Sequence, residues 1–362
     1  MKFLMLFIPA AIVLDRLDNI PAALVFACAA LAIVPMSAVM VSATERIAQH
    51  TSAAIGALLN GTFGNAPELI ISLMALRAGL IDVVKASLVG VILGNLLFVL
   101  GLAFLIGGLR HRTQKYNRKG ARMQRSVLMI AATSIVVPSV FDGFVPPSMA
   151  VQENGLNAGV ALILLATYGL SLLYMLKTHP EHFAPKNPVA EVEQSRADAG
   201  GLWRGIATLL FSSLILAFMS EILVGAIEDT TASLGISRAF IGVIVIALIG
   251  GAPESVAAVA MARRNQLDLT MGIAVGSSIQ IALFVAPALM LSSYFIAPRP
   301  LNLMVGTGGV MIVLFPVLLL SMVVSDGRSD WFKGVQLLSV YALIALFCYY
   351  LPDTPLRPLF AG

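Results

Sequence analysis

The sequence predicts an all-α integral membrane protein with about eleven transmembrane helices, and three observations support this fold class. Hydrophobic residues make up 59% of the 362 residues and charged residues only 12%, against roughly 25% charged residues in soluble domains. Apolar stretches long enough to cross a bilayer recur along the chain. Two of them contain the same proline–glutamate motif. Such a composition cannot cover a water-exposed surface, so the lipid bilayer is the expected environment.

The spans are placed by apolar windows that lie between charged residues. They are predicted at 2–14, 20–42, 52–78, 83–108, 126–145, 157–177, 203–227, 239–262, 268–293, 301–325 and 333–351. The first span is short, and its single lysine and apolar run are close to the pattern of a signal peptide. No small-residue cleavage site precedes Asp15 and Arg16, so a short first helix is expected instead.

The basic residues predict the orientation of the chain. Seven of them lie in the connection 109–125, whereas the connection 146–156 contains none. Placing 109–125 in the cytoplasm puts 17 of the 23 lysine and arginine residues on that side, as the positive-inside rule requires. We therefore expect a multi-pass protein of a prokaryotic cell (inner) membrane, with a cytoplasmic N-terminus and an external C-terminus. Because the basic residues lie mostly in connections or near the ends of spans, no nucleic-acid partner is expected.

An internal repeat relates two halves of the chain by an offset of 186 residues. It aligns Pro67 with Pro253, Glu68 with Glu254 and six further identical residues within 27 ungapped columns. The predicted units are an extra N-terminal helix (1–19), a first five-helix repeat (20–177), a cytoplasmic linker (178–202) and a second five-helix repeat (203–362). Because each repeat has an odd number of spans, the two must be inverted. Inverted repeats with helices broken near the midplane are typical of secondary transporters.

The proline–glutamate motifs predict the helix breaks. They read TFGNAPELIIS (62–72) and LIGGAPESVAA (248–258). The residue before a proline avoids the α region, and proline suits the first turn of a new helix. Each span should therefore break just before its proline and restart as a half-helix. Glu68 and Glu254 then lie in first turns, where the helix dipole favours a carboxylate. Such a break is tolerated only where the freed backbone lines a cavity or is covered by protein.

Two opposed half-helices would direct both carboxylates and several carbonyl oxygens toward one point. The candidate metal ligands are Glu68, Glu254, Asn65, Asn95, Ser277 and Gln280, together with the backbone carbonyls of Gly64, Gly250 and Gly251. For the amide and hydroxyl side chains the alternative is a structural role, since such groups commonly join membrane helices. An oxygen-only site suits Ca²⁺, and the sequence has no Cys or His cluster for a softer metal. We expect no cofactor, only Ca²⁺ and H⁺ as transported ions.

Proton coupling is expected at the same carboxylates. In an empty site two neighbouring carboxylates repel each other, so at least one should hold a proton. Metal entry and proton release then compete, which is the basis of an exchanger. Glu45 and Glu221 lie in the spans that precede the two motifs and are candidates for a cytoplasmic-side entrance or a proton relay. For Glu45 the alternative is an ion pair with Arg46 at a helix end.

With these residues the chain resembles the Ca²⁺/H⁺ antiporters, the proton-coupled branch of the Ca²⁺/cation antiporter superfamily. Segments 58–101 and 250–291 are similar to the two repeat regions of that family, and GSSIQIALFV (276–285) is a particularly specific match. The resemblance implies an eleven-helix antiporter that moves Ca²⁺ outward against inward protons by alternating access. It also implies an exchange site at Glu68 and Glu254, and a cytoplasmic vestibule that includes Glu45 and Glu221.

Three departures from the family pattern concern the cation. Gly251 stands where the family usually has Asn, Ser255 where it has His, and Val91 where it has Ser. One side-chain oxygen is missing from each half, so exchange of Na⁺, K⁺ or Mn²⁺ for protons on the same fold stays open. An intramembrane enzyme is a remote alternative, because the sequence offers no nucleophile or His pair to act with the carboxylates. The sequence fixes neither the proton stoichiometry nor the oligomeric state.

Overall fold

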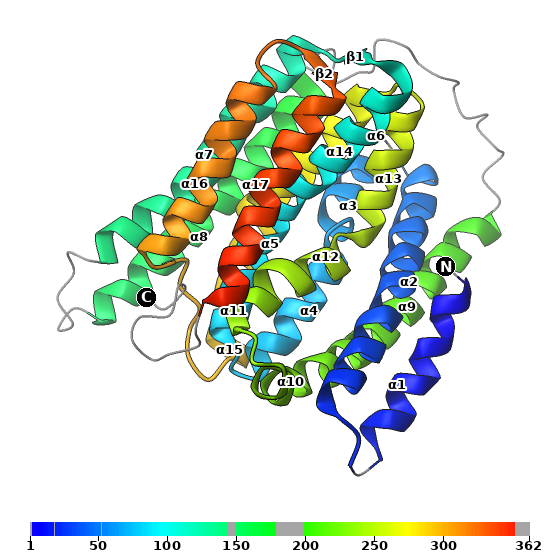
Figure 1. Cartoon of the computed structure of the whole chain (residues 1–362), viewed down its shortest axis with the longest axis vertical. Helices are drawn as coiled ribbons and strands as arrows, with labels where there is room; N and C mark the ends of the chain where they lie inside the picture. The colour runs from blue at the N-terminus through cyan, green and yellow to red at the C-terminus, as the bar shows by residue number, and fades with distance from the viewer. Residues whose placement is uncertain (1, 18, 52, 143–149, 179–198, 352–362) are drawn as a thin grey trace.

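The protein is a bundle of long helices with a short two-stranded ribbon at one end (Figure 1). The structure, a computed structural model, describes residues 2–17, 19–51, 53–142, 150–178 and 199–351. Most of the predicted linker 178–202 lies outside the described residues, as do residues 146–149 and 352–362.

The elements follow the order of the predicted spans. Those of the first half are η1 (Lys2–Leu6), α1 (Phe7–Asp15), α2 (Ala22–Gln49), α3 (Ala53–Phe63), α4 (Ala66–Arg77), α5 (Ile81–Leu93), η2 (Gly94–Val99), α6 (Leu100–His111), β1 (Thr113–Lys115), α7 (Arg118–Asp142), α8 (Ala150–Leu173) and η4 (Tyr174–Thr178). Those of the second half are α9 (Ala199–Gly225), α10 (Ile227–Leu234), α11 (Arg238–Phe240), η6 (Ile241–Ile246), α12 (Ala247–Gly250), α13 (Ala252–Arg263), α14 (Leu267–Gln280), η7 (Ile281–Val285), α15 (Ala286–Ile296), α16 (Thr307–Val323), β2 (Arg328–Asp330) and α17 (Trp331–Tyr350).

The predicted all-α membrane architecture is confirmed. Six of the described helices are long and apolar enough to cross a membrane, and a seventh span is formed by a pair of helices bent by 60°. The apolar helices over 3–15 and 308–323 are shorter than these. The count of eleven spans and the inversion of the two halves stay predictions.

One predicted span begins later than expected. The sequence predicts a helix over 301–325, but residues 301–306 are not helical and α16 begins at Thr307. The non-helical segment is covered by protein, and Ser139 holds it by accepting from Val305 N at 2.9 Å and donating to Leu303 O at 3.3 Å. Protein cover of this kind allows irregular backbone at membrane depth. The apolar composition of 301–306 could not distinguish a buried extended segment from a helix.

Four spans contain π-helical segments that the sequence did not predict, namely η2, η4, η6 and η7, and two of them are related by the repeat. η2 joins α5 to α6, and η7 joins α14 to α15. Their ends, Val99 and Val285, are related by the repeat offset of 186 residues. Segments of this kind are rare and concentrate at functional sites. Here Asn95 lies within η2, and Gln280 directly precedes η7.

Corresponding elements of the two halves make corresponding contacts. α6 packs against α13 and α17, and α15 packs against α4 and α8. The turns that follow α4 and α13 also correspond, because Gly79 and Asn265 both adopt the left-handed conformation, with φ angles of 78° and 61°. Glycine and asparagine are the residues that accept this conformation most readily after a helix. The two motif helices α4 and α13 therefore have corresponding neighbours.

Large apolar side chains cover much of the outside of the bundle. α9 exposes Trp203, Phe211 and Leu214, and α8 exposes Ile163 and Leu170. In water such surfaces would mark an interaction site or a risk of aggregation. Because lipid tails are apolar, a membrane-spanning helix can expose these residues without cost.

Candidate ion-binding site

Both motif spans break where the proline–glutamate motifs predict. In the first half α3 ends at Phe63 and α4 begins at Ala66, with Asn65 as its N-cap residue. In the second half α12 ends at Gly250 and α13 begins at Ala252, with Gly251 as the N-cap residue. Each new helix has its proline in second place and its glutamate in third place. Both carboxyl groups therefore lie in a first helical turn, at the positive end of the helix dipole.

Glu68 and Glu254 come together from opposite halves of the chain. The Glu68 side chain lies against Gly250, because a methyl group on this glycine would be only 3.1 Å from Glu68 Cγ. Gly250 ends α12 directly before the break, and Glu254 lies in the first turn of α13 after it, so the Glu68 side chain lies beside the second helix break. Among the described residues, neither carboxyl oxygen of Glu68 has a hydrogen-bond partner, nor does Glu254 Oε2. A carboxylate in such surroundings is costly unless a proton or a cation neutralises it.

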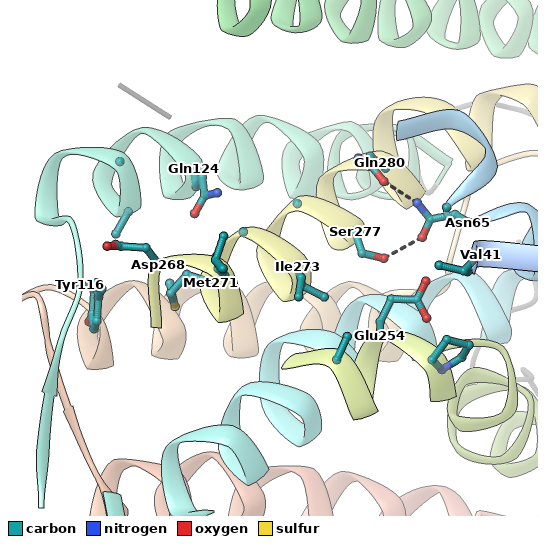
Figure 2. Close-up of a pocket in the computed structure, with 18 of the residues that line it drawn as sticks. Val41, Asn65, Tyr116, Gln124, Glu254, Asp268, Met271, Ile273, Ser277 and Gln280 are labelled. Atoms are coloured by element: carbon teal, nitrogen blue, oxygen red, sulfur yellow. Dashed lines mark hydrogen bonds between the residues drawn. The ribbon is translucent and has the colours of Figure 1, made fainter. Parts of the chain in front are cut away.

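The four predicted amide and hydroxyl ligands form one hydrogen-bonded network between the halves. Asn65 Nδ2 donates to Gln280 Oε1 at 2.5 Å, and Asn65 Oδ1 accepts from Ser277 Oγ at 2.6 Å. Ser277 Oγ also accepts from Asn95 Nδ2 at 3.0 Å. In Figure 2 the carboxyl group of Glu254 points toward the side of this network where Ser277 and Asn65 lie. The network donors and acceptors satisfy one another, so a bound cation would replace some of these hydrogen bonds.

A cavity of about 430 Å³ leads from one end of the bundle to this network (Figure 2). Tyr116 and Asn117 line it at the α6–α7 connection, and Asp268 lines it from the first turn of α14. Asn65 and Glu254 line it at the helix breaks. Glu68 is only 5% exposed and borders instead a void of about 10 Å³. An ion that enters through this cavity therefore meets Glu254 before Glu68.

The two other predicted acids lie in different places. Glu45 is exposed and lines the cavity, one helical turn after Val41 in α2. Glu221 does not line the cavity, and it is exposed on the face of α9 that also carries Leu214 and Phe218. The structure thus brings Glu45 to the cavity of the candidate ligands and does not bring Glu221 there.

The three glycines whose carbonyls were predicted as ligands also differ in their position relative to the cavity. Gly64 lines the cavity. Gly250 is buried and packs against Glu68. The Gly251 carbonyl accepts from Ser255 N at 3.0 Å and from Ser255 Oγ at 2.7 Å. Gly64 is therefore the one of the three that lies on the cavity wall.

Several residues of the cavity wall were not predicted as site residues. Gln124, Asn117 and Tyr116 line the cavity from the basic stretch 109–125. Their neighbours are lysines and arginines, which indicated the orientation of the chain and nothing about a cavity. The one feature of the sequence that could have indicated them is that these three side chains are polar but uncharged, within a connection whose other polar residues are mostly charged.

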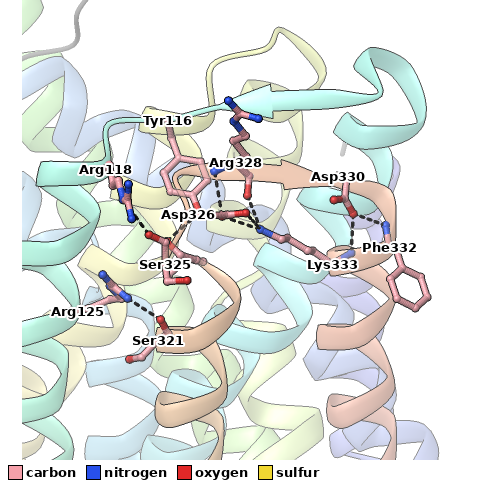
Figure 3. A network of polar contacts seen from close by, with 11 residues as sticks. Tyr116, Arg118, Arg125, Ser321, Ser325, Asp326, Arg328, Asp330, Phe332 and Lys333 are labelled. Atoms are coloured by element: carbon pink, nitrogen blue, oxygen red, sulfur yellow. Dashed lines mark hydrogen bonds and ion pairs between the residues drawn. The ribbon is translucent and has the colours of Figure 1, made fainter.

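Tyr116 also belongs to a network that ties the α6–α7 connection to α16 (Figure 3). The Tyr116 hydroxyl donates to Val324 O and Arg118 Nε donates to Ser325 O, each at 3.1 Å. Burial raises the pKa of Tyr116, so its hydroxyl keeps the proton that it donates. Arg125 Nη1 donates to Ser321 O at 2.5 Å. A cationic donor near the C-terminal end of α16 also complements the dipole of that helix. Together these contacts fix α7 and the α6–α7 connection against the end of α16, on one side of the cavity mouth.

A cation in this cavity would be held by oxygen atoms of mixed charge. Within the described residues there is no group of three or more His, Cys, Asp or Glu side chains that could hold a metal ion. The two motif carboxylates would therefore be supplemented by neutral amide and hydroxyl oxygens. Oxygen-only ligation of this kind suits Ca²⁺ better than a soft transition metal.

Comparisons with known proteins identify the family to which the chain belongs. The model of the sodium/calcium exchanger protein family matches residues 21–177 and 204–350. A Ca²⁺/H⁺ antiporter of Aphanothece halophytica is 37% identical over 97% of this chain and 96% of its own length. The Ca²⁺/H⁺ antiporter ChaA of Bacillus subtilis (strain 168) is 38% identical over 92% of this chain and 94% of its own length. The structure of native YfkE has a TM-score of 0.81 at 33% identity and covers 96% of this chain and 100% of that one. The chain therefore belongs to the sodium/calcium exchanger protein family, within its Ca²⁺/H⁺ antiporter branch.

Proposed function

We propose that this protein exchanges Ca²⁺ for protons across a membrane by secondary active transport. The observation that carries this proposal is the pair Glu68 and Glu254, which two half-helices bring together from opposite halves of the chain. Three of their four carboxyl oxygens have no hydrogen-bond partner among the described residues. The names of the relatives, which are Ca²⁺/H⁺ antiporters, support the same function.

The exchange follows from the electrostatics of the pair. Away from water, two adjacent negative charges are unfavourable, so protons neutralise them when the site holds no metal. A divalent cation supplies the same neutralisation and must displace those protons to bind. Because either protons or Ca²⁺ can neutralise the carboxylates, but not both together, the two ions are coupled. Two carboxylates per divalent cation favour two protons per Ca²⁺.

Neutral oxygens would complete the Ca²⁺ shell. Ca²⁺ takes six to eight oxygen ligands. Asn65, Ser277 and Gln280 line the end of the cavity, and Asn95 is bonded to Ser277 behind them. The Gly64 carbonyl lies on the cavity wall as a further oxygen. We assign Glu45, which lines the same cavity, to the entrance rather than to the metal shell.

A second candidate is the exchange of Na⁺, K⁺ or Mn²⁺ for protons on the same fold. It rests on an asymmetry between the halves. The repeat offset relates Asn65 to Gly251 and Ser277 to Val91, and neither Gly251 nor Val91 has a polar side chain. The neutral side-chain oxygens therefore lie on one side of the carboxylate pair, which leaves fewer ligands than a Ca²⁺ shell can accept.

The cavity also indicates an orientation in the membrane. It opens at the basic connection 109–125, which the positive-inside rule places in the cytoplasm. We therefore infer a cytoplasmic N-terminus, an external C-terminus and a conformation in which the site is open to the cytoplasm. Ca²⁺ would enter through the cavity from the cytoplasm and leave on the other side in exchange for protons.

A cation series in proteoliposomes tests the proposal. With an imposed pH gradient, we expect proton-driven uptake of ⁴⁵Ca²⁺ that is abolished by a protonophore. Unlabelled Ca²⁺, Mn²⁺, Na⁺ and K⁺ are then added as competitors, and Ca²⁺ should compete most strongly. Uptake of Na⁺ or K⁺ without uptake of Ca²⁺ would establish the second candidate. No cation flux from folded protein would refute both.

A further inference from the structure

A second cavity lies at the opposite end of the bundle from the cavity that reaches Glu254. Its volume is about 480 Å³, and its wall includes Asp82, Lys85, Arg238, Arg299 and Asn302. These residues come from the start of α5, from the start of α11 and from the α15–α16 connection. In Figure 1 this end lies at the bottom, near the α10 and α15 labels, whereas the β1–β2 ribbon at the cavity mouth lies at the top.

The repeat offset relates the walls of the two cavities to each other. Asp268, Leu269 and Met271 line the first cavity, and Asp82, Val83 and Lys85 stand 186 residues before them in the second cavity. In the same way Asn302 in the second cavity corresponds to Tyr116 in the first. The second cavity is therefore the counterpart, in the other half, of the mouth of the first.

The two cavities differ in depth because their helices pack differently. In the first cavity Gly276 faces open space, since a methyl group on it would meet no atom within 4 Å. At the corresponding Gly90, a methyl group would overlap the backbone of Val243 in η6. Two small voids of about 10 Å³ each lie between the second cavity and Glu68, and Leu88 lines both. Lys85 lines the one next to the second cavity, and Glu68 and Ser87 line the other. The route from the second cavity to Glu68 is therefore closed by the contact of α5 with η6.

Lys85 lies on this closed route, because it lines both the second cavity and the first of the two voids that separate this cavity from Glu68. Its side chain is only 3% exposed, although it lines the second cavity. Lys85 Nζ donates to Met304 O at 2.8 Å, and Met304 belongs to the non-helical segment 301–306. The corresponding residue of the open cavity is Met271, which has no charge. Burying an ammonium group costs free energy, so its presence at only one of the two related positions indicates a function there.

Alternating access requires a second ion pathway, here from the second cavity to Glu68, and we propose that Lys85 is the residue that keeps this pathway closed. In the closed state the bond from Lys85 to Met304 O joins α5 to the segment 301–306. When α5 and η6 separate, the ammonium group lines the pathway and repels a divalent cation. This repulsion lowers the affinity for Ca²⁺ on this face and favours its release.

An accessibility measurement tests the pathway. Ser87→Cys places a thiol beside Glu68, in a background in which the two buried cysteines, Cys28 and Cys348, are replaced by Ala. A membrane-impermeant methanethiosulfonate reagent is added from the face that carries Arg299. We expect Lys85→Met, which installs the side chain of the related position, to accelerate modification at least tenfold. Met271→Lys, which alters the other cavity, should leave the rate unchanged.

Transport measured from each face separates a gate from a structural role. Lys85→Met should lower the KM for Ca²⁺ on the Arg299 face about tenfold and leave the KM on the opposite face unchanged. A loss of packing alone would change both faces together. Lys85→Gln keeps a donor for Met304 O without the charge, so it should lower the KM with less effect on accessibility. If the Lys85→Met variant does not fold, Lys85→Gln is measured in its place.

The inference rests on the proposed exchange function only for the direction of Ca²⁺ release. Modification of Ser87→Cys requires no Ca²⁺, so it is measured even if the protein transports another cation. An unchanged modification rate in folded Lys85→Met and Lys85→Gln would overturn the proposed gate. A protein without Ca²⁺ flux but with the expected change in modification would refute the ion assignment alone.

Discussion

Asn65 uses both ends of its amide to join the two halves of the protein. Its Nδ2 donates to Gln280 Oε1 and its Oδ1 accepts from Ser277 Oγ. Both partners belong to the second half, whereas Asn65 is the N-cap residue of α4 in the first half. At the scale of single residues, the candidate metal site is therefore held together by neutral hydrogen bonds around two carboxyl groups.

Removing the Asn65 amide should weaken Ca²⁺ binding. Asn65→Ala deletes one ligand and leaves Gln280 Oε1 and the Ser277 hydroxyl without this partner. We expect the apparent affinity for Ca²⁺, measured as the KM of ⁴⁵Ca²⁺ uptake, to fall about tenfold, or about 1.4 kcal/mol. Ser278→Ala is the matched control, because this buried hydroxyl donates to Ala274 O within its own helix. Equal effects of the two substitutions would contradict the assignment of Asn65 as a ligand.

Gly251 should influence the choice of cation. A side chain at this position would start 3.9 Å from Asn95 Oδ1 and 3.2 Å from Ala247 O, so it can enter with a small adjustment. Gly251→Asn then adds a neutral oxygen to the second half. We expect a stronger preference for Ca²⁺ over Na⁺ in competition assays, because Ca²⁺ takes more oxygen ligands. Gly251→Ala fills the same space without an oxygen and should leave the preference unchanged. A similar shift with both variants would argue against ligation.

At the residue scale, the sequence indicated the candidate ligands better than the cavity that leads to them. Glu254, Asn65 and Ser277 were found because charged and polar groups are unusual in apolar spans, and all three line the same cavity. The wall residues Gln124 and Asn117 lie in a polar connection, where polarity carries no signal. Glu221 was unusual for the same reason as Glu68, yet its side chain faces away from the cavity.

At the scale of elements, the helix breaks were predictable and the irregularities inside spans were not. A proline after small residues sets the start of α4 and α13, because the local backbone sterics suffice. The π-helical segments η2 and η7 and the extended segment 301–306 depend on contacts with other elements. An apolar sequence is compatible with an α-helix, a π-helical segment or a buried extended segment, so the sequence alone predicted regular helices.

The contact of α6 with α17 offers a test of the packing. A methyl group on Gly334 would overlap the backbone of Leu105 in α6, so Gly334→Ala should separate the two helices. We expect a destabilisation of about 1–3 kcal/mol, seen as a lower unfolding temperature in detergent. Gly155→Ala in α8 is the control, because no atom lies within 4 Å of its new methyl group. Alanine there should stabilise the helix by up to about 1 kcal/mol. A loss of stability in both variants would contradict this packing.

At the scale of the whole molecule, two corresponding halves have different shapes at the two ends of the bundle. One end has a cavity that reaches Glu254, and the other has a cavity that stops before Glu68. The sequence predicted the correspondence, because the repeat is visible in its residues. It could not predict the difference, because a single repeat pattern is compatible with either end open.

Proton linkage is a property of this whole arrangement. If Ca²⁺ displaces protons from Glu68 and Glu254, its binding must release up to two protons. Lower pH should therefore weaken Ca²⁺ binding, with the logarithm of the affinity rising by at most two per pH unit. Calorimetric titrations in buffers of different ionisation enthalpy measure the number of protons released. Binding without proton release at any pH would exclude the competition on which the exchange depends.

The most direct test of the exchange site is ⁴⁵Ca²⁺ uptake into proteoliposomes under an imposed pH gradient. Wild type is compared with Glu254→Gln, Glu68→Gln and the control Asp229→Asn, which changes an exposed carboxylate of α10. The account predicts proton-driven uptake in wild type and the control, and a loss of at least a hundredfold in both glutamine variants. Uptake that survives either glutamine substitution would show that the paired glutamates are not the exchange site.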